Sequence, residues 1–399
     1  ELREIGAHVN FAPDADVNTN PENPVIHVRS FGENPKTVAE KVIAYGRGLE
    51  TGGILSVSKH FPGHGDTDVD SHQALPAVYY NRARLDSVEL YPFKEAIQAG
   101  LGGVMVGHLQ VPALEPDRIT PSSLSHSIVT DLLRGELGFN GLVFTDALAM
   151  KGVAAESDVT VKALKAGNDM VLAPRRLKEE MDAVLEAVEK GELPEEEINA
   201  KCRKVLTYKY ILGLERKPFV KLSGLGTRIN TPQTRDLISR LNLAAITVLN
   251  NKNDVLPLHP DLKEAAILNV GKPEEIEPFD RKMKKYTSFA RFQLRKDLPE
   301  AEQQKLRDSL AAYRRVIVTV TEQRLAPYQS FFAKFAPESP VIYVFYTPAK
   351  SMLQIQRAVS AAEAVVLAHA SRDDVQERVA DLLFGKATAD GRLSASIGG

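Results

Sequence analysis

The sequence predicts an α/β protein built from two consecutive halves. Short apolar runs alternate with amphipathic segments along residues 1–213, which is typical of strands that helices join into a parallel sheet, closed or open. A stretch rich in proline and glycine follows at about 213–235, and the alternation then resumes. We therefore expect a domain at 1–215, a linker at 216–235 and a second α/β domain at 236–399.

The first half contains five short apolar runs. They lie at 8–12, 53–58, 102–107, 141–145 and 169–173. Runs of this kind indicate strands that are buried on both faces. Amphipathic segments predict helices at 37–50, 85–98, 127–137 and 159–166, and charged helices at 177–189 and 195–212. Pro35 and Gly52 suit the start and the end of the first helix.

The second half has the same kind of pattern. Its predicted strands lie at 245–249, 265–270, 315–320, 340–345 and 364–369. The pattern predicts an α/β fold but does not give the order of the strands.

Composition argues against several classes of function. The 399 residues include 50 basic and 52 acidic ones, for a net charge of −2, so the charge gives no reason to expect a nucleic-acid partner. No apolar run approaches the roughly 20 residues of a membrane-spanning helix. The single cysteine, Cys202, rules out an internal disulfide and a cysteine metal cluster.

The most informative segment is 59–72, which holds three histidines, three aspartates and a lysine directly after a predicted strand. Polar groups just past the carboxyl end of a strand form the active sites of many α/β enzymes. We considered a metal site formed by His60, His64 and His72 with Asp66, Asp68 and Asp70. Glycines and a proline interrupt the spacing, and no helix brings two of these residues to one face. We therefore predict no metal and no cofactor.

Two other patterns point to acid–base and nucleophilic chemistry. Asp70 precedes His72 by two residues, so its carboxylate can fix the tautomer of the imidazole and make it a proton donor. The alternative is a hydrogen bond that only stabilises the loop. Asp146 follows the predicted strand at 141–145 and can attack an anomeric carbon. Its alternative role is to cap the turn that follows.

Cationic groups stand at the same predicted rim. Arg29 lies in a loop after the first predicted strand, and Lys59 and His60 end the second. Such groups donate hydrogen bonds to the hydroxyl or acetamido oxygens of a neutral ligand, although a lone arginine is also consistent with a surface ion pair. No glycine-rich phosphate-binding phrase occurs in the sequence.

Together these phrases resemble glycoside hydrolase family 3, in particular its bacterial β-N-acetylglucosaminidase branch. The matching text comprises residues 10–18, 29–32, 59–65, 70–72 and 145–146, in the order found in the family. The Lys-His-Phe-Pro-Gly-His-Gly phrase at 59–65 is highly specific. The Asp-Ser-His phrase at 70–72 separates this branch from the family's β-glucosidases.

The resemblance implies a role for each matching residue. Asp146 corresponds to the nucleophile, His72 to the general acid/base and Asp70 to the residue that polarises it. Arg29, Lys59 and His60 correspond to residues that hold a terminal N-acetylglucosamine. The implied reaction is retaining hydrolysis of a β-linked terminal N-acetylglucosamine, typically in peptidoglycan fragments. A β-glucosidase, a β-glycoside phosphorylase and a non-catalytic sugar-binding module are the alternatives.

The resemblance also implies an architecture. Residues 1–215 correspond to part of a TIM-type (β/α) barrel, and the second half resembles the α/β sandwich domain of longer family members. We expect the first βα units of the barrel to be missing here and to be supplied by a preceding segment of the parent chain or by a separate chain. The predicted partner is a small glycan substrate. Longer family members are more often exported than cytoplasmic, which favours the cell envelope, periplasm or secretion and leaves the cytoplasm as the alternative.

Overall fold

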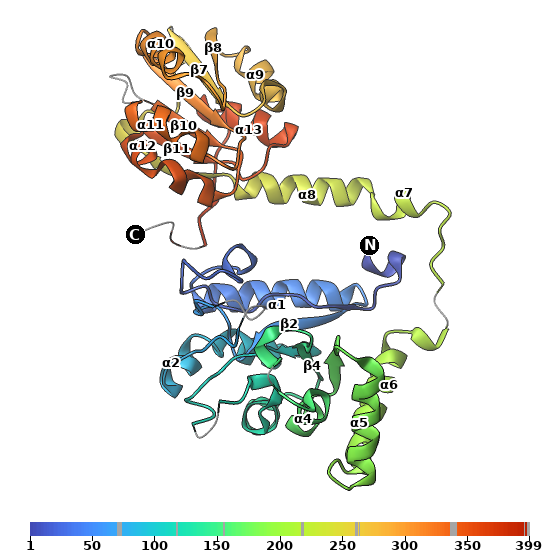
Figure 1. Cartoon of the computed structure of the whole chain (residues 1–399). Helices are drawn as coiled ribbons and strands as arrows, with labels where there is room; N and C mark the ends of the chain where they lie inside the picture. The colour runs from blue at the N-terminus through green and yellow to red at the C-terminus, as the bar shows by residue number, and fades with distance from the viewer. Residues whose placement is uncertain are drawn as a thin grey trace. The chain divides into compact units, whose positions relative to one another are not determined.

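The chain divides into two compact units. A computed structural model describes residues 1–69, 74–116, 119–154, 156–216, 219–259, 262, 264–335, 341–394 and 396. The first unit is Glu1–Ile229 with Ser394 and Ser396, and the second is Asn230–Leu393. Both units combine strands with surrounding helices (Figure 1). Among the described helices, none is long and apolar enough to cross a membrane.

The first unit is built on a five-stranded parallel sheet. Its strands are β1 (Val9–Asn10), β2 (Leu55–Phe61), β3 (Gly103–Val106), β4 (Leu142–Ala147) and β5 (Met170–Leu172). They pair in chain order, and each pair is parallel. Each of the five predicted strands is present, and the arrangement is that of a half-barrel. The structure extends β2 to Phe61, so Lys59 and His60 lie within the strand and not after it.

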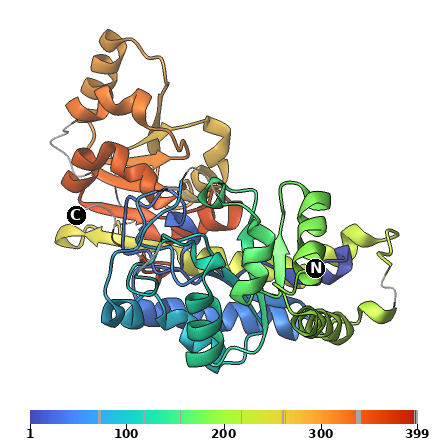
Figure 2. The same ribbon diagram turned by 60° about the horizontal axis from the view of Figure 1, so that its bottom comes forward.

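Helices lie between these strands and, from α5 on, after the last of them. They are α1 (Pro35–Thr51), α2 (Arg82–Ser87), α3 (Tyr91–Gln98), a π-helix η4 (Ser127–Glu136), α4 (Val159–Ala166), α5 (Leu177–Glu189), α6 (Glu195–Ile211) and α7 (Leu225–Ile229). Helix α1 packs along β2 and against α3, and it is the long helix beside the sheet in Figures 1 and 2.

The prediction of one helix over 85–98 is wrong. Two helices, α2 and α3, cover this stretch, and α3 begins with Pro92 in its first turn. Proline has no backbone N–H and clashes with the preceding turn of a continuous helix, but it is tolerated in a first turn. The chain therefore ends one helix and starts another.

Both faces of the first sheet are buried. Val104, Val106 and Val143 belong to one apolar cluster, whereas the alternate residues Met105 and Phe144 belong to another. Side chains along a strand point to opposite faces in turn, so covering both faces requires the continuous apolar runs seen in the sequence.

The second unit has a six-stranded sheet in the order β6-β11-β10-β9-β7-β8. The strands are β6 (Thr247–Asn251), β7 (Ala265–Val270), β8 (Phe289–Leu294), β9 (Arg315–Val320), β10 (Val341–Phe345) and β11 (Ala364–Leu367). All neighbours are parallel except β6, which runs antiparallel to β11. The sequence interpretation did not include β8, because this edge strand carries Arg291 and Gln293 among its apolar residues and is only half-buried.

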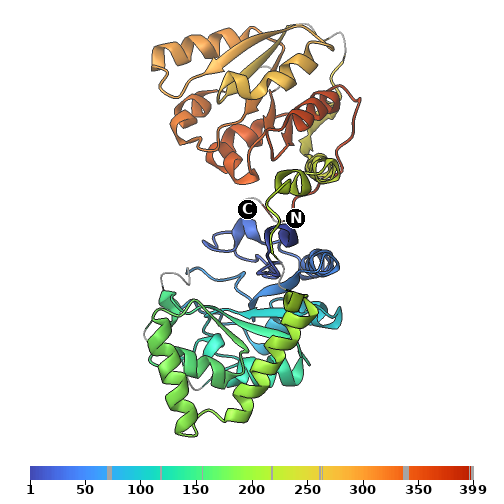
Figure 3. The same cartoon turned by 90° about the vertical axis from the view of Figure 1, so that its right-hand side faces the viewer.

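Helices cover both faces of this sheet, which makes the unit a three-layer α/β sandwich (Figure 3). One apolar layer receives side chains from α10 (Glu300–Ala311), α11 (Gln329–Lys334) and α12 (Gln356–Ala361). The other receives them from α9 (Glu277–Met283) and α13 (Asp373–Leu383). Helix α8 (Pro232–Ala245) precedes β6, so α7 and the first turn of α8 occupy much of the predicted linker.

Candidate active site

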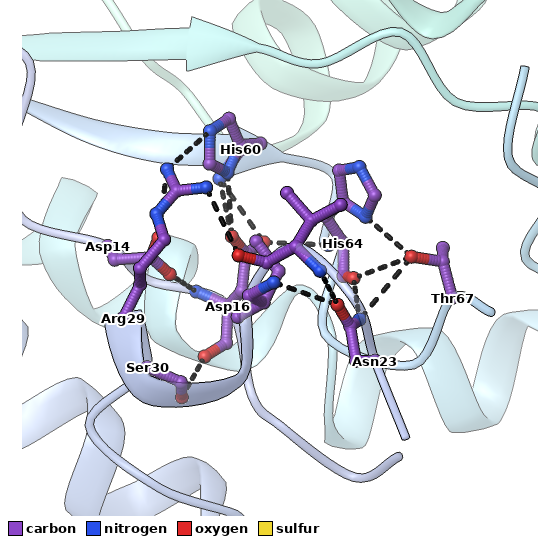
Figure 4. Close-up of polar contacts among 10 residues, drawn as sticks. Asp14, Asp16, Asn23, Arg29, Ser30, His60, His64 and Thr67 are labelled. Atoms are coloured by element: carbon purple, nitrogen blue, oxygen red, sulfur yellow. Dashed lines mark hydrogen bonds and ion pairs between the residues drawn. The ribbon is translucent and has the colours of Figure 1, made fainter. Parts of the chain in front are cut away.

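A buried aspartate, Asp16, joins the segment after β1 to the carboxyl end of β2. Its Oδ2 atom is 2.7 Å from His60 Nδ1, and its Oδ1 accepts a 2.6 Å hydrogen bond from the backbone N–H of His64. The backbone N–H of His60 also donates to Asp16, at 3.2 Å. Asp16 is fully buried, and Figure 4 shows these contacts converging on its carboxylate. Asp16 therefore fixes the positions of both histidine backbones.

The His60 ring is held in one tautomer. Burial lowers the pKa of His60 to about 4, so the imidazole is neutral near pH 7. A neutral ring has one N–H, and the Asp16 carboxylate accepts it from Nδ1. Nε2 is then an acceptor, and it lies 3.4 Å from Nη2 of Arg29. His60 can therefore accept a hydrogen bond from a guanidinium or from a ligand hydroxyl.

Arg29 stands between His60 and a second aspartate, Asp14. It ends the short helix η2 (His27–Arg29), and its Nη2 atom is 3.6 Å from Asp14 Oδ2. Asp14 is only 8% exposed. Burial and the neighbouring Asp16 charge raise the pKa of Asp14 to about 8, so its carboxyl group is largely protonated at neutral pH. Arg29 thus faces a mostly neutral acid.

Asp14 and Asp16 were quoted in the family motif, but the sequence interpretation gave them no role. A signal for them was present in the sequence. Residues two apart on an extended chain point to the same side, and Asp14 and Asp16 follow the first predicted strand in this spacing. The structure pairs Asp14 with Lys59 in an isolated parallel bridge, so the extended segment runs beside the end of β2.

Asp146 lies on the same rim, near the end of β4. It is partly exposed, and its Oδ1 accepts a 2.8 Å hydrogen bond from the next backbone N–H, that of Ala147. Its negative charge acts on both Lys59 and His60 and opposes the fall in pKa that burial imposes on each. Asp146 therefore lies at the same sheet edge as Lys59 and His60, and Arg29 joins them through its contact with His60.

His108, which the sequence interpretation omitted, supports the Asp146 loop. It follows β3 and is fully buried. Nε2 lies 3.1 Å from the carbonyl oxygen of Ala147, and Nδ1 lies 2.7 Å from Ser123 Oγ. Burial lowers the pKa of His108, so the neutral ring donates from Nε2 and accepts at Nδ1. Its position two residues after the predicted strand's apolar core was the available signal.

The segment after β2 is held in place by close packing. A Cβ atom at Gly65 would overlap the backbone carbonyl of Val17, so only glycine fits there. Asn23 donates a 2.9 Å hydrogen bond to the carbonyl of His64, and Thr67 Oγ1 lies 2.6 Å from His64 Nδ1. Figure 4 shows Asn23 and Thr67 on the side of His64 away from His60.

The other predicted residues have different outcomes. Asp70 and His72 lie outside the described residues. Among residues weighed as metal ligands, Asp66 accepts a 2.9 Å hydrogen bond from Thr19 and Asp68 is exposed. The structure instead groups Asp14, Asp16 and His60, whose candidate ligand atoms lie within 4.8 Å of one another. Because His60 and Asp16 already bind each other, we interpret this group as an aspartate–histidine pair.

Comparison with known proteins identifies the family. The model of the glycosyl hydrolase family 3 N-terminal domain matches residues 1–208. The chain belongs to glycosyl hydrolase family 3. A β-hexosaminidase A from Pseudoalteromonas piscicida is 38% identical over 280 residues, which cover 65% of this chain and 46% of that protein. A β-N-acetylglucosaminidase/β-glucosidase from Cellulomonas fimi is 30% identical over 269 residues, which cover 65% of this chain and 48% of that protein.

A solved family 3 structure extends the likeness to both units. The β-N-acetylglucosaminidase of a Paenibacillus species has a TM-score of 0.77 and 30% identity, and the match covers 99% of this chain and 77% of that one. This family 3 chain spans about half the length of the curated relatives that it matches.

Proposed function

We propose that this family 3 protein is a retaining β-N-acetylglucosaminidase with Asp146 as its nucleophile. The observation that carries the proposal is that Lys59 and His60, near the end of β2, and Asp146, near the end of β4, lie at the carboxyl edge of one parallel sheet. The relatives described as β-hexosaminidase and β-N-acetylglucosaminidase support the choice of sugar.

The position of Asp146 suits a nucleophile. It is partly exposed at the carboxyl edge of a parallel sheet, where parallel α/β enzymes present reactive groups. The hydrogen bond from the Ala147 N–H to Oδ1 fixes the carboxylate and leaves Oδ2 for attack on the anomeric carbon. His108 holds Ala147 from the other side and so limits movement of the loop.

Arg29, Lys59 and His60 supply what a neutral sugar needs. Two cations can donate hydrogen bonds, and the His60 Nε2 atom can accept one. Because Asp14 is largely neutral, it does not neutralise the Arg29 guanidinium, which contacts His60 Nε2 and the Val25 carbonyl at 3.4 Å and has further N–H groups for a ligand. Lys59 is half-buried, so its ammonium group is partly shielded from water, and burial lowers its pKa.

His72 and Asp70 complete the proposal through the family resemblance. His72 would protonate the leaving oxygen while Asp146 attacks, which gives a glycosyl ester. His72 would then take a proton from water, whose oxygen attacks the anomeric carbon, releases the sugar and frees Asp146. The same group is the acid in the first step and the base in the second, and the two successive displacements at the anomeric carbon give net retention of configuration.

Trapping of the ester tests the nucleophile. The protein is incubated with a 5-fluoro-N-acetylglucosaminyl fluoride, digested and mapped by mass spectrometry. We expect the sugar on the peptide that contains Asp146, and no label in Asp146→Asn. Asp131→Asn, at an exposed helix position, is the matched control and should label normally. Label on another carboxylate would remove Asp146 from this role.

Substrate comparison tests the sugar. We expect p-nitrophenyl β-N-acetylglucosaminide to be cleaved with a kcat/KM at least about tenfold above that of the β-glucoside, which corresponds to about 1.4 kcal/mol. The reverse order would favour the β-glucosidase reading. Formation of sugar 1-phosphate when phosphate is added would favour phosphorolysis.

A further inference from the structure

The second unit has a hollow at a position where doubly wound sheets bind ligands. After β7 the chain forms β8, which is the neighbour of β7 on one side. The next strand, β9, is the neighbour of β7 on the other side, and β10 and β11 then continue in that direction. The direction of winding therefore reverses between β7 and β9. Crevices outside the carboxyl ends of strands at such a switch point are the usual ligand sites of open α/β sheets.

A cavity of about 720 Å³ lies at this point, which is within the usual size of small-molecule sites. The residues that directly follow three strands line it: Gly271 after β7, Arg295 after β8 and Thr321 after β9. A second hollow of about 540 Å³ at the ends of β9, β10 and β11 shares Glu275, Thr321 and Gln323 with the first. The two hollows together can accommodate a ligand larger than an inorganic ion.

The lining of the larger cavity carries an excess of positive charge. Four cations, Lys272, Arg295, Lys296 and Arg324, stand against two carboxylates, Glu275 and Glu322. Arg295 pairs with Glu302 at 3.2 Å. Within the described part of the chain, no carboxylate lies within ion-pair distance of Lys272, Lys296 or Arg324. A phosphate monoester carries close to two negative charges at neutral pH and so matches this excess.

At the floor of the cavity the backbone at Gly271 lies close to Thr321. A Cβ at Gly271 would overlap Thr321 Oγ1, and the φ of Gly271 is +137°, so only glycine suits the position. The Gly271 carbonyl accepts a hydrogen bond of 2.7 Å from Gln293 Nε2 and one of 3.4 Å from Asn269 Nδ2. These bonds hold the backbone between two strand ends. The rim cations therefore surround a fixed floor.

We propose that the carboxyl edge of β7, β8 and β9 is a binding site for a small phosphorylated metabolite, such as a sugar phosphate or a nucleotide. The phosphate group sits among Lys272, Arg295, Lys296 and Arg324, where arginine can form paired hydrogen bonds to its oxygens. The remainder of the ligand extends over Thr321 toward the second hollow. This site belongs entirely to the second unit and does not depend on the proposed hydrolase activity.

Isothermal titration calorimetry of the full chain tests the site with glucose 6-phosphate, AMP, inorganic phosphate and glucose. We expect saturable binding of at least one phosphate ester with a dissociation constant below about 1 mM, and at least about tenfold weaker binding of glucose. The two esters distinguish a sugar-phosphate site from a nucleotide site. Equal binding of glucose and glucose 6-phosphate, or no binding of either ester, would overturn the proposal.

Charge reversal locates the binding. The double variant Lys272→Glu with Arg324→Glu should weaken the bound ester at least about tenfold. Lys285→Glu is the matched control. It reverses an exposed charge just after α9, which begins near the carboxyl end of β7 and returns the chain to the start of β8, and it should change the affinity less than twofold. Equal effects of the two changes would exclude this cavity. Circular dichroism verifies that each variant is folded.

Discussion

Replacement of Asp14 by asparagine should change the pH dependence of stability in a defined window. The Asp14 carboxyl has a pKa of about 8 in the folded protein, against an ordinary value of 3.8. The folded state therefore holds more protons than the unfolded state between these limits, and stability falls as pH rises. The slope is about 1.4 kcal/mol per pH unit. Asp14→Asn lacks this titration.

His60 has the opposite sign over a lower range. Its folded pKa of about 4 lies below the ordinary 6.5, so its contribution to stability is lost as pH falls from 6.5 toward 4. Above pH 6.5 the His60 contribution changes by only about 0.4 kcal/mol more, so the Asp14 contribution dominates. Between pH 6.5 and 8, the free energy of unfolding of Asp14→Asn should rise by about 2 kcal/mol relative to the wild type.

Urea unfolding followed by circular dichroism at both pH values measures this difference. The chain contains no tryptophan, so far-ultraviolet dichroism is the suitable signal. Val57→Ala, which truncates a fully buried side chain in β2, identifies the transition of the first unit. In Asp14→Asn the new amide group faces Arg29 in place of the carboxyl group. This changes the free energy of unfolding by an amount that does not vary with pH. Only the change with pH is diagnostic.

Two results would refute the reasoning. A difference between wild type and Asp14→Asn that is constant from pH 6.5 to 8 would mean that Asp14 is already ionised at neutral pH. A relative loss of stability in the variant as pH rises would mean that a group other than the Asp14 carboxyl titrates in this range and responds to the substitution. Asp68→Asn, at an exposed position, is the control and should show no change with pH.

Three further predictions concern neighbouring residues. Asp16→Asn removes a buried charged acceptor of three hydrogen bonds and should cost about 2–4 kcal/mol in urea unfolding; a cost below that of Asp68→Asn would contradict the anchoring role. Gly65→Ala should cost at least about 2 kcal/mol because of the overlap with Val17, whereas Gly48→Ala in α1, with open space around it, should gain up to about 1 kcal/mol. His72→Ala should slow p-nitrophenyl glycosides much less than alkyl glycosides in steady-state assays, because a poor leaving group needs a proton donor; equal losses would remove His72 from the acid role.

The sequence predicted those strands whose own residues form a clear apolar pattern. Strands β3 and β4 are buried on both faces, so their apolar runs stand out. Strand β8 is an edge strand that alternates apolar residues with Arg291 and Gln293. This pattern alone is too weak to predict a strand, and pairing with β7 is visible only in the structure. The break between α2 and α3 depends on Pro92, a signal that was available but was outweighed by the amphipathic pattern of the whole stretch.

The site was less predictable because its contacts join distant segments. Arg29, Lys59, His60 and Asp146 were selected from motif and strand ends, which sequence shows directly. The hydrogen bond between Asp16 and His60 spans 44 positions, and the one between His108 and Ala147 spans 39. The hydrophobic periodicity of the sequence reflects only neighbouring residues and cannot predict contacts between residues so far apart. The protonation of a buried acid such as Asp14 is also not predictable from the sequence, since it depends on burial and on the nearby Asp16.

The protonation of Asp14 links these observations to the proposed chemistry. If Asp14 were charged, it would hold the Arg29 guanidinium at 3.6 Å and add a second negative charge beside Asp16. Arg29 would then be neutralised before any ligand arrived. With Asp14 protonated, Arg29 and Lys59 face a rim on which Asp146 is the partly exposed carboxylate. In the proposed function, a neutral sugar bound there would meet the Arg29 and Lys59 donors on one side and the proposed nucleophile Asp146 on the other. We therefore expect Asp14→Asn to keep sugar binding near neutral pH, and a large loss of binding in that variant would mean that the charge of Asp14 itself holds the ligand.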